Sequence, residues 1–174
     1  KDTASGNIGI EGGTITATGK INAAGIGSVY KNTCGDITIT GGTVTASGGN
    51  TAAGIGSGQY GTCGNITIAG GTVTSTGGNF GAGIGCGQDG TCGDISILGG
   101  TVTSTPGSYA AGIGCGGDGK CGKITITGDM TRVIATKIDR YVDIIGSSST
   151  GSKCGAVTID PSLIDVTSDD DLTL

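Results

Sequence analysis

Histidine and tryptophan are absent from this chain of 174 residues, aromatic residues make up 3% of it, and charged residues 13%. Histidine is the usual general base near neutral pH, and the regular part of the sequence has no cluster of acids, arginines or lysines to replace it. The net charge of −5 is unsuited to nucleic acid, which is bound through lysine and arginine. We therefore expect neither an enzyme nor a nucleic-acid-binding protein, and no cofactor.

Long apolar runs are also missing, so the sequence predicts no insertion into a membrane. The chain starts at Lys1 with no visible signal peptide, which leaves open whether one has been removed.

Glycine is abundant, with 40 residues, but it does not follow the G-X-Y triplet of collagen. Instead the sequence repeats with a period of 29: Gly-Ile-Gly begins at Gly25, Gly54, Gly83 and Gly112, and Cys-Gly at Cys34, Cys63, Cys92 and Cys121, with Cys154 following after a longer interval of 33. A fixed period of roughly 20 to 50 residues indicates a solenoid or a propeller.

Within one repeat, apolar residues alternate with threonine in Ile37–Ile39 and Thr43–Ala46. This alternation predicts strands with the isoleucines, Val44 and Ala46 facing inward and the threonines facing solvent. A third short segment is expected at residues 53–56. Three short strands fit one coil of a parallel β-helix, whereas a propeller blade has four strands and about 40 residues. We predict an all-β fold, a right-handed parallel β-helix (β-solenoid) of about five coils.

The predicted organisation has three parts. Residues 1–128 form the regular coils, which keep the period of 29. Residues 129–160 keep the outline of a coil but are four residues longer. They also carry charged side chains, at Lys137, Asp139, Arg140 and Asp143. We expect them to be a degenerate coil that caps the exposed sheet edges. Residues 161–174 are expected to be an acidic tail or linker.

The stretches AGIGSG, CGNITI and GGTVTSTGG resemble the glycine-rich repeats of secreted and cell-surface proteins of gut-type bacteria. The resemblance covers about residues 6–159 and implies an extracellular β-solenoid. It also implies adhesion, with a glycan or a host or surface protein as the partner. A passive structural spacer is a further alternative.

Aromatic residues in the loops are the expected ligand-binding residues. Phe80 and Tyr109 occupy the same position of successive repeats, so their rings are expected to stack one coil apart; Tyr60 lies in an outer loop, with Tyr30 nearby. Exposed rings can take the face of a sugar. The alternative is an aromatic ladder that only covers the end of a loop.

Outward-facing hydroxyl residues form three columns, in which eleven of twelve positions are threonine. The columns are Thr14, Thr43, Thr72 and Thr101; Thr16, Thr45, Thr74 and Thr103; and Thr18, Ser47, Thr76 and Thr105. They resemble the T-x-T arrays of β-solenoid antifreeze proteins, which implies ice binding as an alternative function. Threonine is also simply a good outward β-former.

Two acidic residues, Asp89 and Asp118, occupy the same position of successive repeats. Like charges one coil apart repel, so a bound calcium ion is conceivable; calcium sites usually have more carboxylates, and solvated loop acids are the alternative.

Seven cysteines without histidine make a zinc site an unfavourable interpretation, because Cys86/Cys92 and Cys115/Cys121 are spaced too widely for it. The column of Cys34, Cys63, Cys92 and Cys121 is expected to pack inward. Cys86 and Cys115 are additional, and could form disulfides with Cys92 and Cys121 or with each other.

Overall fold

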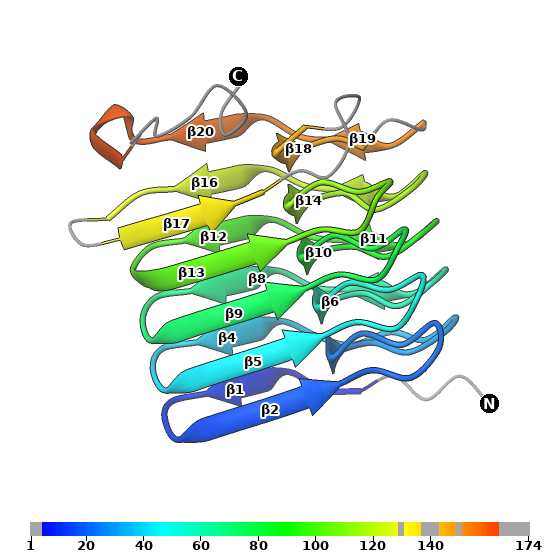
Figure 1. Cartoon of the computed structure of the whole chain (residues 1–174), viewed down its shortest axis with the longest axis horizontal. Coiled ribbons are helices and arrows are strands. Elements are labelled where there is room, and N and C mark those ends of the chain that lie inside the picture. Colours follow the sequence, from blue (N-terminus) through cyan, green and yellow to red (C-terminus); the bar gives the residue numbers. More distant parts are fainter. Residues whose placement is uncertain (1–4, 129–130, 137–142, 149–150, 164–174) are drawn as a thin grey trace.

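Each coil contains several short strands, and each strand pairs with the equivalent strand of the next coil. Ile37, for example, pairs with Ile66, and Ile66 with Ile95. The computed structural model describes residues 5–128, 131–136, 143–148 and 151–163. All strand pairs in these residues are parallel, and they form a β-solenoid of five coils, which confirms the predicted architecture (Figure 1). Near strands run to the right, far strands to the left, and later coils lie above earlier ones, so the winding is right-handed.

The strands form four parallel sheets, which we name by their composition. The isoleucine sheet contains β1 (Ile8–Ile10), β4 (Ile37–Ile39), β8 (Ile66–Ile68), β12 (Ile95–Ile97), β16 (Ile124–Ile126) and β20 (Val157–Ile159). The threonine sheet contains β2 (Thr14–Thr18), β5 (Thr43–Ser47), β9 (Thr72–Thr76), β13 (Gly100–Thr105) and β17 (Thr131–Ala135). The glycine sheet contains β3 (Ile26–Gly27), β6 (Ile55–Gly56), β10 (Ile84–Gly85), β14 (Ile113–Gly114) and β18 (Ile145–Gly146).

The fourth sheet, the cysteine sheet, contains β7 (Thr62–Cys63), β11 (Thr91–Cys92), β15 (Lys120–Cys121) and β19 (Lys153–Cys154). Coils 2 to 5 therefore have four strands where three were predicted, whereas coil 1 has three strands and an isolated bridge at Thr33. Two residues are too few to show alternation in the sequence, and only pairing with the next coil makes them a strand. A 3-10 turn, η1 (Pro161–Leu163), follows β20, and no described helix is long and apolar enough to span a membrane.

Stacked isoleucines fill the interior. Ile55, Ile66 and Ile95 are fully buried, and Val44 and Ala46 are 1% exposed, which confirms the predicted inward faces. Two buried serines at the Ala46 position of later coils, Ser75 and Ser104, donate hydrogen bonds of 2.6 Å to the carbonyl oxygens of Gly83 and Gly112. Each buried hydroxyl thus has a partner, as burial requires.

The fifth coil keeps the sheets in register although it is four residues longer. Gly100 pairs with Thr131, Gly114 with Gly146, and Cys121 with Cys154, so the offset between partners grows from 31 to 32 and then to 33 along the coil. The extra residues therefore fall between strands. Its capping role stays a prediction, and Lys137, Asp139, Arg140 and residues 164–174 lie outside the described residues.

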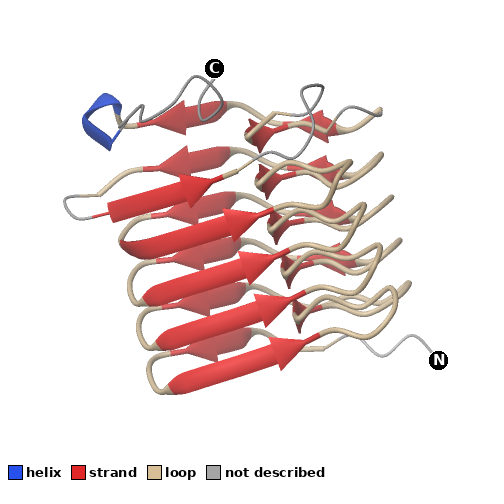
Figure 2. Ribbon diagram, viewed as in Figure 1, coloured by secondary structure: helices blue, strands red, loops and turns tan. Residues whose placement is uncertain are grey.

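Loops gather along one edge of the solenoid, opposite the tight turns that join the isoleucine and threonine sheets (Figure 2). Loop 1 follows the threonine sheet, at residues 19–25, 48–54, 77–83 and 106–112 of the first four coils. Loop 2 follows the glycine sheet, at residues 28–32, 57–61, 86–90 and 115–119.

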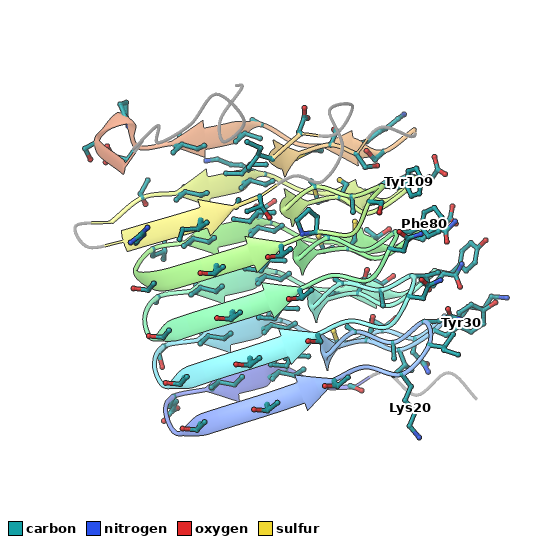
Figure 3. All side chains as sticks on the ribbon, viewed as in Figure 1. Lys20, Tyr30, Phe80 and Tyr109 are labelled. Atoms are coloured by element: carbon teal, nitrogen blue, oxygen red, sulfur yellow. The ribbon has the colours of Figure 1, made fainter. Side chains whose placement is uncertain are left out.

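Several loop glycines are required because successive coils approach backbone to backbone. A Cβ atom on Gly49 would collide with the carbonyl oxygen of Lys20, and one on Gly78 with that of Gly49. In coil 1, Lys20 occupies the position that Gly49 and Gly78 occupy in coils 2 and 3. Its side chain points away from coil 2 (Figure 3). A side chain is tolerated there because no described coil lies beneath it.

We predict that Gly78→Ala lowers the free energy of unfolding by about 2 kcal/mol or more, because backbone must move to admit the methyl group. The matched control is Gly9→Ala in β1, where a Cβ meets nothing within 4 Å. It should be neutral or stabilise by about 0.5–1 kcal/mol, since alanine restricts the unfolded chain. Chemical denaturation measures both; equal effects would contradict the close approach.

Candidate functional site

Loops 1 and 2 lie against each other and form one continuous surface, which we call the loop edge. The backbone amide of Gln59 in loop 2 donates to the carbonyl of Asn22 in loop 1 of the preceding coil, at 3.1 Å. Gln88 repeats this bond with Thr51 at 2.8 Å. Loop 2 of each coil therefore rests on loop 1 of the coil before it.

Phe80 and Tyr109 stack, as their shared column predicted: the ring centroids are 4.9 Å apart and the planes differ by 14°. Both rings lie on the loop edge (Figure 3). Tyr109 is 41% exposed and Phe80 is half-buried. Because the rings cover one face of each other, a ligand can reach only the ring edges and the outer faces.

A second aromatic pair joins coils 1 and 2. Tyr30 and Tyr60 meet edge to face, with centroids 6.0 Å apart and planes at 81°. The Lys31 ammonium lies 5.1 Å from the Tyr30 centroid and 5.9 Å from that of Tyr60, within the range of a cation–π interaction. Both tyrosines are exposed. Sequence reasoning placed Tyr60 in the site but missed Lys31, although the two occupy the same position of successive repeats. The contact of Tyr30 with Tyr60 could not be read from a column, because these two rings meet diagonally.

One column of loop 2 consists of residues whose backbone is in the left-handed conformation. Lys31, Tyr60, Asp89 and Asp118 have φ between 54° and 55°. Each is the third residue of a turn closed by a backbone bond, such as Gly61 N to Gly58 O at 3.0 Å. Glycine is preferred there and asparagine or aspartate is tolerated, so the cost of about 1–2 kcal/mol falls on Lys31 and Tyr60.

A chain with 40 glycines nevertheless carries none at these four positions. At Lys31 and Tyr60 the conformational cost indicates that the side chains themselves are useful, because strained residues that persist in a fold concentrate at functional sites. Nothing in residue type alone reveals this column, since it depends on the backbone conformation of the turn.

Asp89 acts on its neighbour in this column. Its negative charge, together with a hydrogen bond between the two side chains, raises the pKa of Tyr60 above the ordinary value for tyrosine; the Lys31 charge acts in the opposite direction. Tyr60 therefore stays a neutral hydrogen-bond donor to higher pH than a free tyrosine.

We predict that Asp89→Asn lowers the pKa of Tyr60, because the phenolate then forms without a facing carboxylate. The pH titration of the Tyr60 ring resonance by NMR measures the shift. Asp118→Asn, one coil further away, is the control and should leave that titration near the wild-type curve. An unchanged Tyr60 titration in Asp89→Asn would show that the two side chains do not interact.

The calcium interpretation of Asp89 and Asp118 receives no support from the geometry. Among the described residues, no group of three or more histidine, cysteine, aspartate or glutamate side chains is placed to hold a metal ion. Both acids instead belong to the left-handed column of loop 2.

A separate ladder of side chains holds consecutive coils together. Backbone amides donate to side-chain oxygens of the preceding coil: Asp36 N donates to Asn7 Oδ1 at 3.0 Å, and Asn65 N to Asp36 Oδ1 at 2.7 Å. Asp94 and Lys123 continue it, with amide bonds of 2.9 and 2.8 Å. Asparagine and aspartate alternate, so Asp36 and Asp94 are two coils apart, and the ladder is structural.

The threonine sheet presents its hydroxyl columns to solvent. Nine of the twelve predicted positions are exposed, whereas Ser47, Thr103 and Thr105 are half-buried. The residues pair in register from β2 to β13. The array ends at β17, where Arg132 and Ile134 pair with Thr101 and Thr103.

All seven cysteines are free thiols, so the disulfides expected for Cys86 and Cys115 are not formed in this structure. Cys86 is accommodated as a buried thiol, with its Sγ 3.8 Å from the carbonyl oxygen of Gly114. The column of Cys34, Cys63, Cys92 and Cys121 packs inward as predicted, with exposed fractions between 1% and 8%.

The stacked coils, the in-register columns and the repeated glycine turns define a parallel β-helix repeat protein. The beta helix repeat family matches residues 8–28, 37–59, 66–88 and 95–117, which together make up more than half of the chain. The chain belongs to the beta helix repeat family. Comparisons with curated proteins and with solved structures gave no match.

Proposed function

We propose that this protein is an extracellular surface module that binds a glycan at the loop edge. The observation that carries the proposal is the left-handed column of loop 2, where Lys31 and Tyr60 stand at positions that favour glycine and Asp89 and Asp118 continue the same column. Side chains that are retained at a conformational cost, on an exposed edge, are the expected contacts of a ligand.

The chemistry of this edge suits a sugar. Tyr30 and Tyr60 offer exposed rings, against which the apolar face of a pyranose can pack. Polar groups stand beside them: Gln59 Nε2 donates to Gln88 Oε1 at 3.2 Å, and the Asp89 carboxylate interacts with Tyr60. Amides and carboxylates on rigid turns provide the directional hydrogen bonds that hydroxyl groups require.

A second candidate function is ice binding by the threonine sheet. Its support is the in-register array of exposed threonines on four consecutive strands, from β2 to β13. Hydroxyls and methyl groups repeat at about 4.8 Å between coils, a spacing set by the strands themselves. Such a surface would act collectively, because each hydroxyl contributes only about 1 kcal/mol or less.

One pair of variants distinguishes these functions. We expect Tyr60→Ala to weaken glycan binding about two- to tenfold, since a ring contact contributes about 0.5–1.5 kcal/mol. Thr74→Tyr lies on the threonine sheet and not on the loop edge, so it should leave glycan affinity unchanged. It should also leave the melting temperature unchanged, because tyrosine is a good strand residue. A glycan array identifies the ligand and titration calorimetry measures affinity.

Thermal hysteresis is measured on the same preparations. Hysteresis in the wild-type protein that disappears in Thr74→Tyr would favour the ice-binding function over the loop edge. If the array and the hysteresis assay are both negative, the proposed glycan binding is wrong, and binding of a surface protein and a passive structural spacer are the remaining alternatives.

A further inference from the structure

Three thiols from two consecutive coils meet at the end of the regular repeats. Cys115 directly follows β14, Cys121 ends β15, and Cys154 ends β19 in the fifth coil. The Sγ atoms of Cys115 and Cys121 are 2.9 Å apart, and Cys121 pairs in register with Cys154. Cys115 also donates to the carbonyl oxygen of Lys153 at 3.3 Å.

The scaffold does not require sulfur at the Cys115 position. Coils 1 and 2 have Ser28 and Ser57 there, and each serine Oγ accepts a hydrogen bond of 3.2 Å from a backbone amide of the next coil, at Gly58 and Gly87. Both serines are buried. Serine thus satisfies both the packing and the hydrogen bonding of this position. What cysteine adds is the reactivity of its thiol and not a structural contact.

We propose that Cys115 and Cys121 are an oxidative cross-linking site, and that Cys154 is the thiol through which an oxidant reaches this buried pair in the folded protein. The bridge would span loop 2 of coil 4 and fix the turn that carries Asp118. This inference is independent of the proposed glycan binding, because it concerns the covalent state of the coil and needs no ligand.

Accessibility assigns the first step to Cys154. It is half-buried, whereas Cys115 is fully buried and Cys121 is 8% exposed. Hydrogen bonds from Cys115 and Cys121 lower the pKa of the Cys154 thiol, while the bond with Cys121 and burial raise that of Cys115. The thiolate is the attacking form, so the most exposed thiol is also the most reactive of the three.

The chemistry is thiol–disulfide exchange with a small-molecule disulfide, RSSR. The Cys154 thiolate attacks one sulfur of RSSR, forms a mixed disulfide and releases one thiolate. Cys121 then displaces the second thiolate from Cys154, and Cys115 attacks Cys121 and releases Cys154 as a thiol. In total two protein thiols are oxidised, the S–S bond of RSSR is broken, and two molecules of RSH carry the two protons and electrons.

The test treats the folded, reduced protein with oxidised glutathione, blocks the remaining thiols, and digests it with a protease that cleaves before aspartate. Cleavage at Asp94, Asp118, Asp129, Asp143 and Asp160 separates the three thiols into peptides 94–117, 118–128 and 143–159. We expect mass spectrometry to find peptide 94–117 linked to 118–128. A final bridge from Cys154, a preferred Cys86–Cys92 bridge or no bridge at all would overturn the proposal.

Variants separate the roles of the three thiols. Cys154→Ser should slow oxidation of the folded protein at least about tenfold, yet give the same bridge after refolding in oxidised glutathione. Cys86→Ser is the matched control and should oxidise at the wild-type rate. Cys115→Ser carries the residue of coils 1 and 2, so it should fold and form no bridge; oxidation of Cys154→Ser at the wild-type rate would overturn the relay.

Discussion

Backbone hydrogen bonds between successive coils are the interaction on which the rest of this structure depends. The amide of Ile37 donates to the carbonyl of Asn65, and that of Ile66 to the carbonyl of Asp94, each at 2.8 Å. Parallel strands that pair in this way lie about 4.8 Å apart, so each residue of a described strand is placed directly above its equivalent. The same spacing in four sheets then dictates which side chains each column can hold.

The columns follow from this spacing. Isoleucine stacks on isoleucine in the buried interior, and glycine is obligatory where loops approach backbone to backbone, as at Gly49 and Gly78. Charges of one sign cannot be repeated cheaply, so asparagine separates Asp36 from Asp94 in the side-chain ladder. The loop edge differs from these uniform columns, because its left-handed turn positions carry tyrosine, lysine and aspartate instead of glycine. A rigid scaffold thereby holds a varied surface, which is the usual arrangement of a binding site.

The fold could be predicted from the sequence because its determinants repeat. The alternation in Ile37–Ile39 predicts the strands and their inward faces, and the fixed spacing of Gly-Ile-Gly predicts the number of coils. The cysteine-sheet strands could not be predicted, since Thr62–Cys63 is too short to show a period. Columns also predicted the stacking of Phe80 on Tyr109. The columns place Lys31 next to Tyr60, but they could not reveal the diagonal contact of Tyr30 with Tyr60, nor the left-handed turns, which depend on backbone torsions.

The pairing of coils is tested most directly by NMR scalar couplings across hydrogen bonds, which connect an amide nitrogen to the carbonyl carbon of its acceptor. The account predicts a coupling from the Ile66 amide to the Asp94 carbonyl, and one from Ile37 to Asn65, each joining one coil to the next. Couplings between residues 37–39 and 43–47 of a single repeat would instead indicate an antiparallel hairpin. That result would contradict the stacked coils and, with them, the loop edge.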